Sequence, residues 1–142
     1  MNGLDIENRL PRHLVLLLHE CPNAPTHVDW LLAGDISGHT PLKSFRIADR
    51  LDAMHAGGRQ TLVPLPDHRP RYLRCDGPLS GDRGVVRRLA RGRLWTSSEP
   101  DVFRIHWRTG SAAGRTQWIR LLPGSADHDL DVCCEGWNSR NA

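Results

Sequence analysis

Long apolar runs are missing from this chain of 142 residues, and that absence excludes membrane-spanning helices. The longest apolar run covers only residues 14–18, whereas a membrane-spanning helix needs roughly 18 apolar residues. Asp5 and Glu7 precede that run, and no plausible cleavage site follows it, so we also expect no signal peptide. The sequence therefore predicts a cytoplasmic protein without a membrane partner.

Cysteine, lysine and tyrosine are scarce. The four cysteines include no Cys-x-x-Cys pair, which excludes a zinc ribbon and a thioredoxin-type site, and without a secretory signal we expect reduced thiols. Lys43 is the single lysine beside 18 arginines, and Tyr72 is the single tyrosine. Genome composition can produce an arginine excess, but guanidinium is also the side chain best matched to phosphate oxygens. Composition alone leaves both explanations open.

Long helical periodicities are missing as well, because 13 glycines and 10 prolines divide the chain into short segments. A short helix is expected at residues 49–56, before Gly57-Gly58. Many short apolar or alternating segments between turn residues predict an all-β, mainly antiparallel fold, a compact β-barrel with one or two short flanking helices. The expected strands cover residues 13–20, 27–32, 42–47, 60–65, 71–76, 84–89, 93–96, 102–108, 116–122 and 130–134.

The length predicts a single domain with a substantial core. We place that core at residues 12–122 and an acidic C-terminal tail at residues 123–142. The tail is either a closing strand or a loose end, and its Asp-x-Asp-x-Asp pattern fits a solvated face better than a cation site. Its charged residues are Asp127, Asp129, Asp131, Glu135 and Arg140.

Positive charge is concentrated in one segment. Residues 69–93 contain eight arginines and two aspartates, a local net charge of 8 − 2 = +6, whereas the whole chain carries +3. Glycines at positions 77, 81, 84 and 92 allow the backbone to come close to a ligand. Such a segment suits contact with phosphate, and the alternative is a solvated strand face.

His19, His27 and Asp29 form the first candidate site. Side chains alternate along a strand, so His27 and Asp29 share one face while Trp30 and Leu32 fill the core. His19 returns near this pair if residues 21–25 form a hairpin loop. Two imidazoles and one carboxylate suit Mn²⁺, Fe²⁺ or Zn²⁺. The alternative is ordinary hydrogen-bonding side chains near a turn.

His68 and Tyr72 form a second group. Tyr72 lies among arginines rather than apolar residues. An imidazole titrates near neutral pH, so His68 is suited to contact a phosphate or to donate a proton. The alternative is a loop histidine and a partly buried tyrosine that covers the barrel.

The order of these motifs resembles the 3′-phosphoesterase domain at the N-terminus of bacterial DNA ligase D and its small stand-alone relatives. That family has a His followed by His-x-Asp, then Leu-Lys-Ser-Trp, then Asp-His-x-x-x-Tyr, then a Gly-rich turn and a closing strand. The matching segments here are, in that order, His19, His27-Val28-Asp29, Leu42-Lys43-Ser44-Phe45, Asp67-His68-Arg69-Pro70-Arg71-Tyr72, residues 76–84 and residues 117–120. The resemblance covers residues 12–122.

The resemblance implies a β-barrel enzyme that trims 3′-phosphate or 3′-ribonucleotide ends of DNA before ligation, with Mn²⁺ or another divalent transition metal as cofactor. By this resemblance His19, His27 and Asp29 hold the metal, and His68 and Tyr72 are the catalytic residues that address the phosphate. The implied partners are DNA with a primer-template or nicked 3′ end, and a DNA ligase or other end-joining protein.

One position departs from the family pattern. The family extends His-x-Asp to His-x-Asp-x-Arg, and Leu31 stands at the place of that arginine. Loss of one such contact to a phosphoryl group costs about 10²–10³ in rate. Arg71 or Arg83 then supplies the phosphate contact together with Lys43, or the protein is a weak or inactive module that binds nucleic-acid ends or a repair partner.

A third interpretation is a non-haem Fe(II) oxygenase. His-x-Asp with a distal histidine, His68 or His106, imitates the facial triad of that class. Such an enzyme needs an arginine for a 2-oxo acid on a later strand, where Arg115 is poorly placed. The short chain and the basic segment also count against it.

Overall fold

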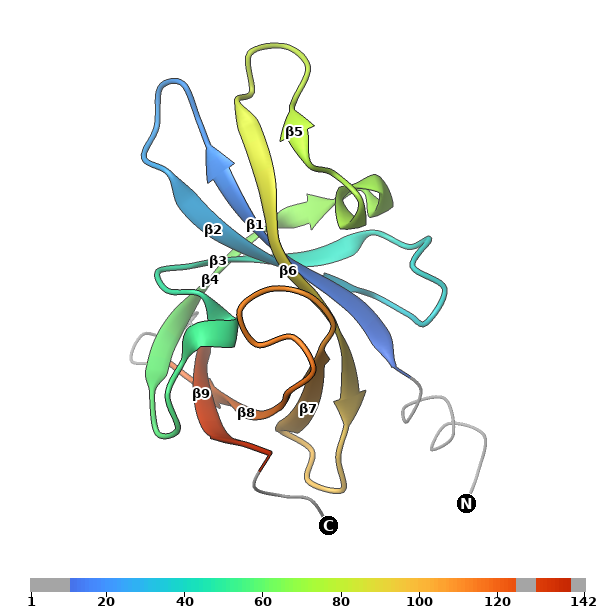
Figure 1. Cartoon of the computed structure of the whole chain (residues 1–142), viewed down its shortest axis with the longest axis vertical. Coiled ribbons are helices and arrows are strands. Elements are labelled where there is room, and N and C mark those ends of the chain that lie inside the picture. Colours follow the sequence, from blue (N-terminus) through green and yellow to red (C-terminus); the bar gives the residue numbers. More distant parts are fainter. Residues whose placement is uncertain (1–10, 125–129, 139–142) are drawn as a thin grey trace.

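A computed structural model describes residues 11–124 and 130–138 of the chain (Figure 1). Within these residues the regular elements are nine strands and two 3₁₀ turns, η1 (Leu51–Ala53) and η2 (Pro70–Leu73). The strands are β1 (Arg12–Glu20), β2 (His27–Ala33), β3 (Leu42–Ile47), β4 (Arg59–His68), β5 (Gly77–Pro78), β6 (Val85–Thr96), β7 (Val102–Trp107), β8 (Thr116–Pro123) and β9 (Leu130–Trp137).

Eight antiparallel strands close into a barrel in the order β1-β2-β3-β4-β9-β8-β7-β6, because β6 pairs again with β1. The ninth strand, β5, is a two-residue addition that pairs with the start of β6. The predicted all-β antiparallel barrel is confirmed, and its flanking helices are reduced to the two 3₁₀ turns. No helix in the described parts of the chain is long and apolar enough to cross a membrane.

Three local predictions differ from the structure. Residues 49–56 contain only η1, and the two strands expected at 84–89 and 93–96 are one long strand, β6, which begins at Val85. The strand expected at 71–76 is wrong, because that segment contains η2. Pro70 at the first position of this turn has the fixed φ that starts a helical turn.

The C-terminal segment is part of the barrel. Strand β9 pairs with β4 on one side and β8 on the other, and Asp131 forms an ion pair with Arg59 across the β4–β9 pair. The segment predicted as a tail therefore contains a closing strand. Asp127 and Asp129 lie outside the described residues.

Strand β1 is buried on both faces, which explains its unbroken apolar sequence. Leu14 and Leu16 point into the barrel and join its core. Val15 and Leu17 belong to a second apolar group on the outer face. There η2 lies against β1 (Figure 1). We call this second apolar group the outer cluster. It contains Val15, Leu17, Leu31, Ala33, Leu42 and Val86, with Tyr72, Leu73, Cys75 and Leu79 packed against it.

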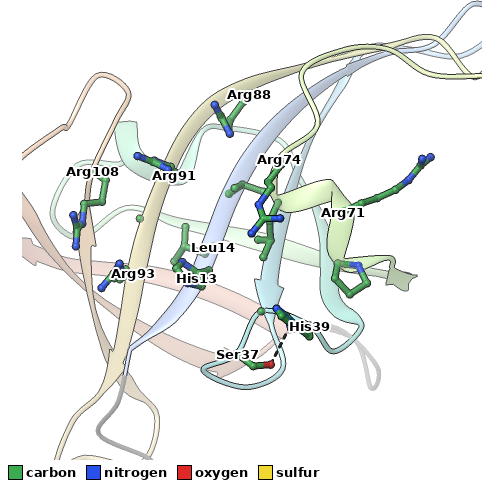
Figure 2. Close-up of a pocket in the computed structure, with 15 residues that line it drawn as sticks. His13, Leu14, Ser37, His39, Arg71, Arg74, Arg88, Arg91, Arg93 and Arg108 are labelled. Atoms are coloured by element: carbon green, nitrogen blue, oxygen red, sulfur yellow. Dashed lines mark hydrogen bonds between the residues drawn. The ribbon is translucent and has the colours of Figure 1, made fainter.

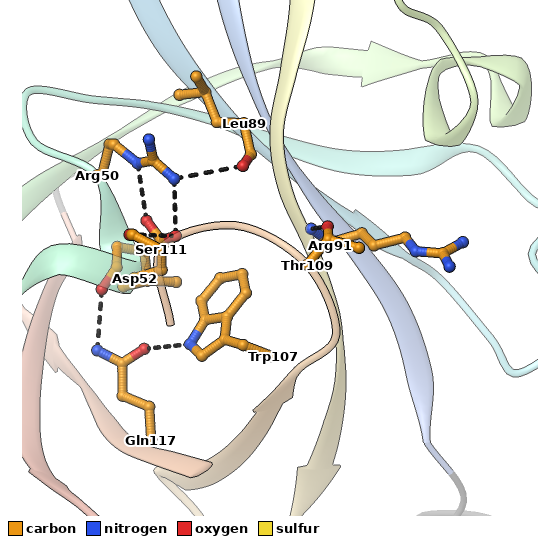
Figure 3. Close-up of polar contacts among 9 residues, drawn as sticks. Arg50, Asp52, Leu89, Arg91, Trp107, Thr109, Ser111 and Gln117 are labelled. Atoms are coloured by element: carbon orange, nitrogen blue, oxygen red, sulfur yellow. Dashed lines mark hydrogen bonds and ion pairs between the residues drawn. The ribbon is translucent and has the colours of Figure 1, made fainter. Parts of the chain in front are cut away.

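A buried polar network ties loop segments to the barrel interior (Figure 3). Gln117 is fully buried, and its amide donates to a carbonyl of η1 while its oxygen accepts from the indole N–H of Trp107. Asp52 is also buried and accepts hydrogen bonds from Arg50 and Ser111. Every polar group in this network has a partner, so it connects η1 to the loop after β7 without leaving buried charge unpaired.

Candidate metal and phosphate site

The predicted metal ligands lie along one hairpin on the outer face of the barrel, beside the outer cluster, but Asp29 lies outside the group of donor atoms that come within 4.8 Å of one another in the described part of the chain. His19 and His27 are direct partners across the β1–β2 pair, and their rings meet edge to face with centroids 5.0 Å apart. Asp29 follows on the same face of β2, with Oδ1 3.4 Å from Nε2 of His27. The antiparallel hairpin thus returns His19 to the His27–Asp29 pair.

Both imidazoles are oriented by backbone carbonyls. Nε2 of His19 donates to the carbonyl of Arg83 at 2.8 Å, and Nδ1 of His27 donates to the carbonyl of Pro25 at 3.2 Å. A carbonyl only accepts hydrogen bonds, so the other nitrogen of each neutral ring carries the lone pair. Histidines that bind metals are oriented in this way, with one N–H held by a second group.

Asp29 carries a buried carboxylate oxygen without a hydrogen bond. The residue is 3% exposed, and Oδ1 has no hydrogen-bond partner among the described residues. Burial raises the pKa of Asp29, while His27, His68 and Arg46 act in the opposite direction. An orphaned carboxylate oxygen beside imidazole lone pairs is a donor set that fits a divalent cation.

Cys21 is a further donor that the sequence prediction missed. It follows His19 by two residues, and the donor atoms of His19, Cys21 and His27 all lie within 4.8 Å of one another. The His-x-Cys spacing at the end of the strand was the available signal, because alternation places both side chains on one face. A thiolate favours Zn²⁺, whereas a carboxylate suits Mn²⁺. The choice between Cys21 and Asp29 therefore decides which metal the site prefers.

Arg46 is a second missed residue. It lies opposite Asp29 in the β2–β3 register, and its Nη2 donates to Nε2 of His27 at 3.3 Å. The exposed guanidinium of Arg46 is therefore hydrogen-bonded to the histidine nitrogen that a metal ion would use. Arg46 also lies on the same face of the sheet as the position two residues after Asp29, where the family pattern has an arginine. Only the pairing of β2 with β3 reveals this neighbour, since spacing along the chain does not.

The second predicted group joins the first at the end of β4. The rings of His68 and Tyr72 meet edge to face at 5.1 Å, and His68 contributes to the electrostatic environment of Asp29. Nη1 of Arg83 donates to the Tyr72 hydroxyl at 3.3 Å, while the backbone of Arg83 holds His19. We call His19, Cys21, His27, Asp29 and His68 the histidine cluster.

Gly84 allows the turn that carries Arg83 to lie against the end of β1. Its φ is +94°, a left-handed conformation that favours glycine. A Cβ at this position would clash with the carbonyl of Glu20. The contact between Arg83 and His19 therefore depends on glycine at the neighbouring position.

Leu31 shares a face with Asp29 but is closed to solvent. It is 0% exposed and belongs to the outer cluster, against which Tyr72 and Leu73 pack. At the position where the family pattern has an arginine, this chain has a buried leucine that is covered by η2.

Of the predicted phosphate contacts, Lys43 lies apart from the histidine cluster, whereas Arg71 adjoins it through Tyr72. Lys43 is exposed and, by alternation, points to the opposite face of β3 from Ser44 and Arg46. Arg71 lies over the ring of Tyr72, with its guanidinium carbon 5.4 Å from the ring centroid. Arg83 is thus the predicted arginine that contacts both groups of the site.

His106 and Arg115, the two oxygenase candidates outside the histidine cluster, lie on another side of the barrel. Nδ1 of His106 is 3.4 Å from Oγ1 of Thr116, between β7 and β8. The guanidinium of Arg115 lies 4.6 Å from the ring centroid of Trp137 on β9. Both belong to the β7–β8–β9 part of the barrel.

No protein-family model matches the chain, and no match is found among curated proteins. The functional argument for this chain therefore depends on its motifs and on the geometry of the histidine cluster.

Proposed function

We propose that this protein is a metal-dependent phosphoesterase that acts on the 3′ ends of DNA, with Mn²⁺ as the metal implied by the family resemblance. The observation that carries the proposal is the buried oxygen of Asp29, which has no hydrogen bond among the described residues and lies 3.4 Å from Nε2 of His27. A buried anion without a hydrogen bond is costly, and a divalent cation would offset that cost.

Each residue of the site has a role that its position supports. A bound metal ion would polarise the phosphoryl oxygen and lower the pKa of a coordinated water. His19, His27 and Asp29 would hold the ion, and His68 beside Tyr72 is placed to hold or donate a proton.

Two guanidinium groups are available to stabilise charge on the phosphoryl oxygens. Arg83 reaches the site through Tyr72, and Arg46 reaches it through His27. Arg46 would leave the histidine nitrogen when a metal binds, and its charge would then be free for the phosphate. This residue takes the role that the family gives to an arginine at the position of Leu31.

The experiment that tests the proposal uses a labelled primer annealed to a template and ending in a 3′-phosphate. Wild-type protein with Mn²⁺ is expected to convert the end to a 3′-hydroxyl, and a chelator is expected to abolish the reaction. His27→Ala and His68→Ala should each lower the rate by about 10²-fold or more. His55→Ala is the matched control, because the side chain of His55 is exposed next to η1. The backbone carbonyl of His55 accepts a hydrogen bond from the N–H of Gly58, and alanine keeps that bond.

A second candidate function is a module that binds DNA ends without hydrolysing them. The burial of Leu31 under η2 favours it, since no charge can reach a phosphate from that position. Wild-type protein that binds metal and the primer yet leaves the 3′-phosphate intact would exclude the phosphoesterase and support this module.

A further inference from the structure

A second concave surface lies on the outer face of β1, at the opposite end of the strand from His19 (Figure 2). It is a cavity of about 540 Å³ bounded by β1, β6, the loop before β3 and the segment that contains η2. We call it the arginine groove, and among the described residues no acidic side chain lines it. Its basic side chains are His13, His39, Arg71, Arg74, Arg88, Arg91, Arg93 and Arg108.

Strand pairing explains why arginines gather here. Arg93 lies opposite His13 and Arg91 lies opposite Val15 in the β1–β6 register, so both guanidinium groups leave the outer face. Arg88 lies opposite Leu17 beyond the bulge that shifts this register. The charge concentrated in residues 69–93 of the sequence is thus directed mostly to one surface.

Arg108 comes from outside that segment and is fixed beside Arg91 by the backbone. The N–H groups of Arg108 and Thr109 donate to the carbonyl of Arg91 at 2.9 and 3.2 Å. In return the N–H of Arg91 donates to Oγ1 of Thr109 at 3.0 Å (Figure 3). The loop after β7 therefore adds a further charge to the groove in a defined place.

The arginines of the groove form no ion pair with a carboxylate in the described part of the chain, although Asp76 accepts from the backbone N–H of Arg88 and Asp35 interacts with the charge of His39. Within residues 11–124 and 130–138, the arginines in ion pairs with carboxylates are Arg50, Arg59, Arg87 and Arg120, none of which lines the groove. Burial lowers the pKa of His13, and the guanidinium groups of Arg93, Arg74, Arg91 and Arg108 lower it further. Like charges that converge on one cavity repel each other, so an anion bound among them is strongly favoured.

We propose that the arginine groove binds the phosphodiester backbone of a nucleic acid whose 3′ end lies at the histidine cluster. This assignment of the groove rests on the proposed function. His13 and His19 lie on one face of β1, six residues and thus about 20 Å apart, which is roughly six stacked nucleotides. Between them, η2 presents Tyr72 to the histidine cluster, and Arg74 directly after it lines the groove.

The chemistry of the lining selects a backbone rather than bases or a single anion. A planar guanidinium group can donate two parallel hydrogen bonds to the oxygens of one phosphate. Several guanidinium groups in one groove therefore match the successive phosphates of a nucleic-acid strand. No Phe, Tyr or Trp side chain lines the groove in the described part of the chain, so the large aromatic platforms on which successive bases stack are missing there. The groove therefore holds nucleic acid independently of sequence.

The test measures binding of a labelled single-stranded oligonucleotide, long enough to span both sites, in the presence of a chelator that prevents turnover. Arg91→Gln with Arg93→Gln should weaken binding by about tenfold or more and reduce the slope of log K against log salt by about 1.4. Arg74→Gln with Arg108→Gln removes two charges from other elements and should behave similarly.

Arg104→Gln with Arg115→Gln is the matched control, since it removes two arginines that lie over Trp95 and Trp137 elsewhere on the barrel. The control should leave binding and its salt slope nearly unchanged. Equal losses in the groove variants and the control would overturn the proposal, because binding would then depend only on net charge. Unchanged oligonucleotide binding with lost binding of inorganic phosphate would also overturn it, in favour of a small-anion site.

Failure of this proposal is distinguishable from failure of the proposed function. The binding assay needs neither metal nor hydrolysis, whereas removal of the 3′-phosphate needs both. Groove variants should raise KM for the primer but leave hydrolysis of a small chromogenic phosphate ester unchanged.

Discussion

Replacing Asp29 by asparagine is expected to stabilise the metal-free protein and to weaken its response to metal. The wild-type carboxylate is 3% exposed, and its Oδ1 lacks a hydrogen bond among the described residues. Burial of the charge raises the pKa of Asp29, and a buried charged acceptor without a hydrogen bond costs at least about 1–3 kcal/mol, whereas the amide of asparagine carries no charge. Arg46 lies opposite Asp29 and offsets part of this cost, so Asp29→Asn should raise the free energy of unfolding by about 1–2 kcal/mol. For a domain of this size, that is a rise in Tm of about 3–8 °C.

The pH dependence of this difference follows from the raised pKa of Asp29. Folded protein takes up the proton at a higher pH than unfolded protein, so the wild type gains stability as pH falls through the folded-state pKa towards 3.8. The amide in Asp29→Asn takes up no proton in this pH range, so the variant does not gain stability in this way. The advantage of the variant should therefore be largest at neutral pH and should shrink as the medium becomes acidic.

Metal should reverse the order of stability. A ligand at 100 times its Kd stabilises the folded state by about 2.7 kcal/mol, and the variant should lose most of that gain. Thermal unfolding of both proteins, with chelator and with Mn²⁺, measures all four values. A variant that is less stable than the wild type in chelator, or that gains as much from metal, would refute the reasoning.

Three further predictions concern other residues. Cys21→Ser should weaken Zn²⁺ binding by at least about tenfold, because the site loses its thiolate ligand. Mn²⁺ binding should stay nearly unchanged, since Asp29 is the third ligand that we propose for Mn²⁺. Calorimetry with each metal would measure both affinities. Leu31→Arg should lower the free energy of unfolding by about 3 kcal/mol or more instead of restoring a phosphate contact, because it places a charge in the outer cluster; denaturant unfolding would measure this loss. Oligonucleotide binding should strengthen as pH falls below neutral. Burial and the neighbouring Arg74, Arg91, Arg93 and Arg108 lower the pKa of His13, a bound phosphate raises it again, and protonated His13 then attracts the phosphate. His13→Gln should remove that part of the pH profile, while His39→Gln tests the other imidazole of the groove.

Most strand positions could be predicted from the sequence, because side-chain alternation and turn residues are local properties. The run at residues 14–18 predicts a buried strand, and β1 has one apolar face in the barrel and another in the outer cluster. The strand expected at 71–76 was wrong for a reason that is not local. Tyr72 and Leu73 pack onto the outer cluster from a 3₁₀ turn, and no alternation in their own segment indicates that contact.

The candidate site shows the same division. His27 and Asp29 share a face of one strand, and the sequence pattern predicts this directly. Cys21 was accessible to the same reasoning through its spacing from His19. Arg46 was not, because its place beside Asp29 depends on the register of β2 against β3.

The sequence by itself determined that His27 and Asp29 share one face of a strand and that positive charge is concentrated in residues 69–93. Tertiary structure alone decided which charged side chains become neighbours. Closure of the barrel places Arg93 of β6 beside His13 of β1, and the loop after β7 brings Arg108 to Arg91. The physical reason is that alternation along a strand is set by its own backbone, whereas contact across strands is set by pairing register and barrel closure between distant segments.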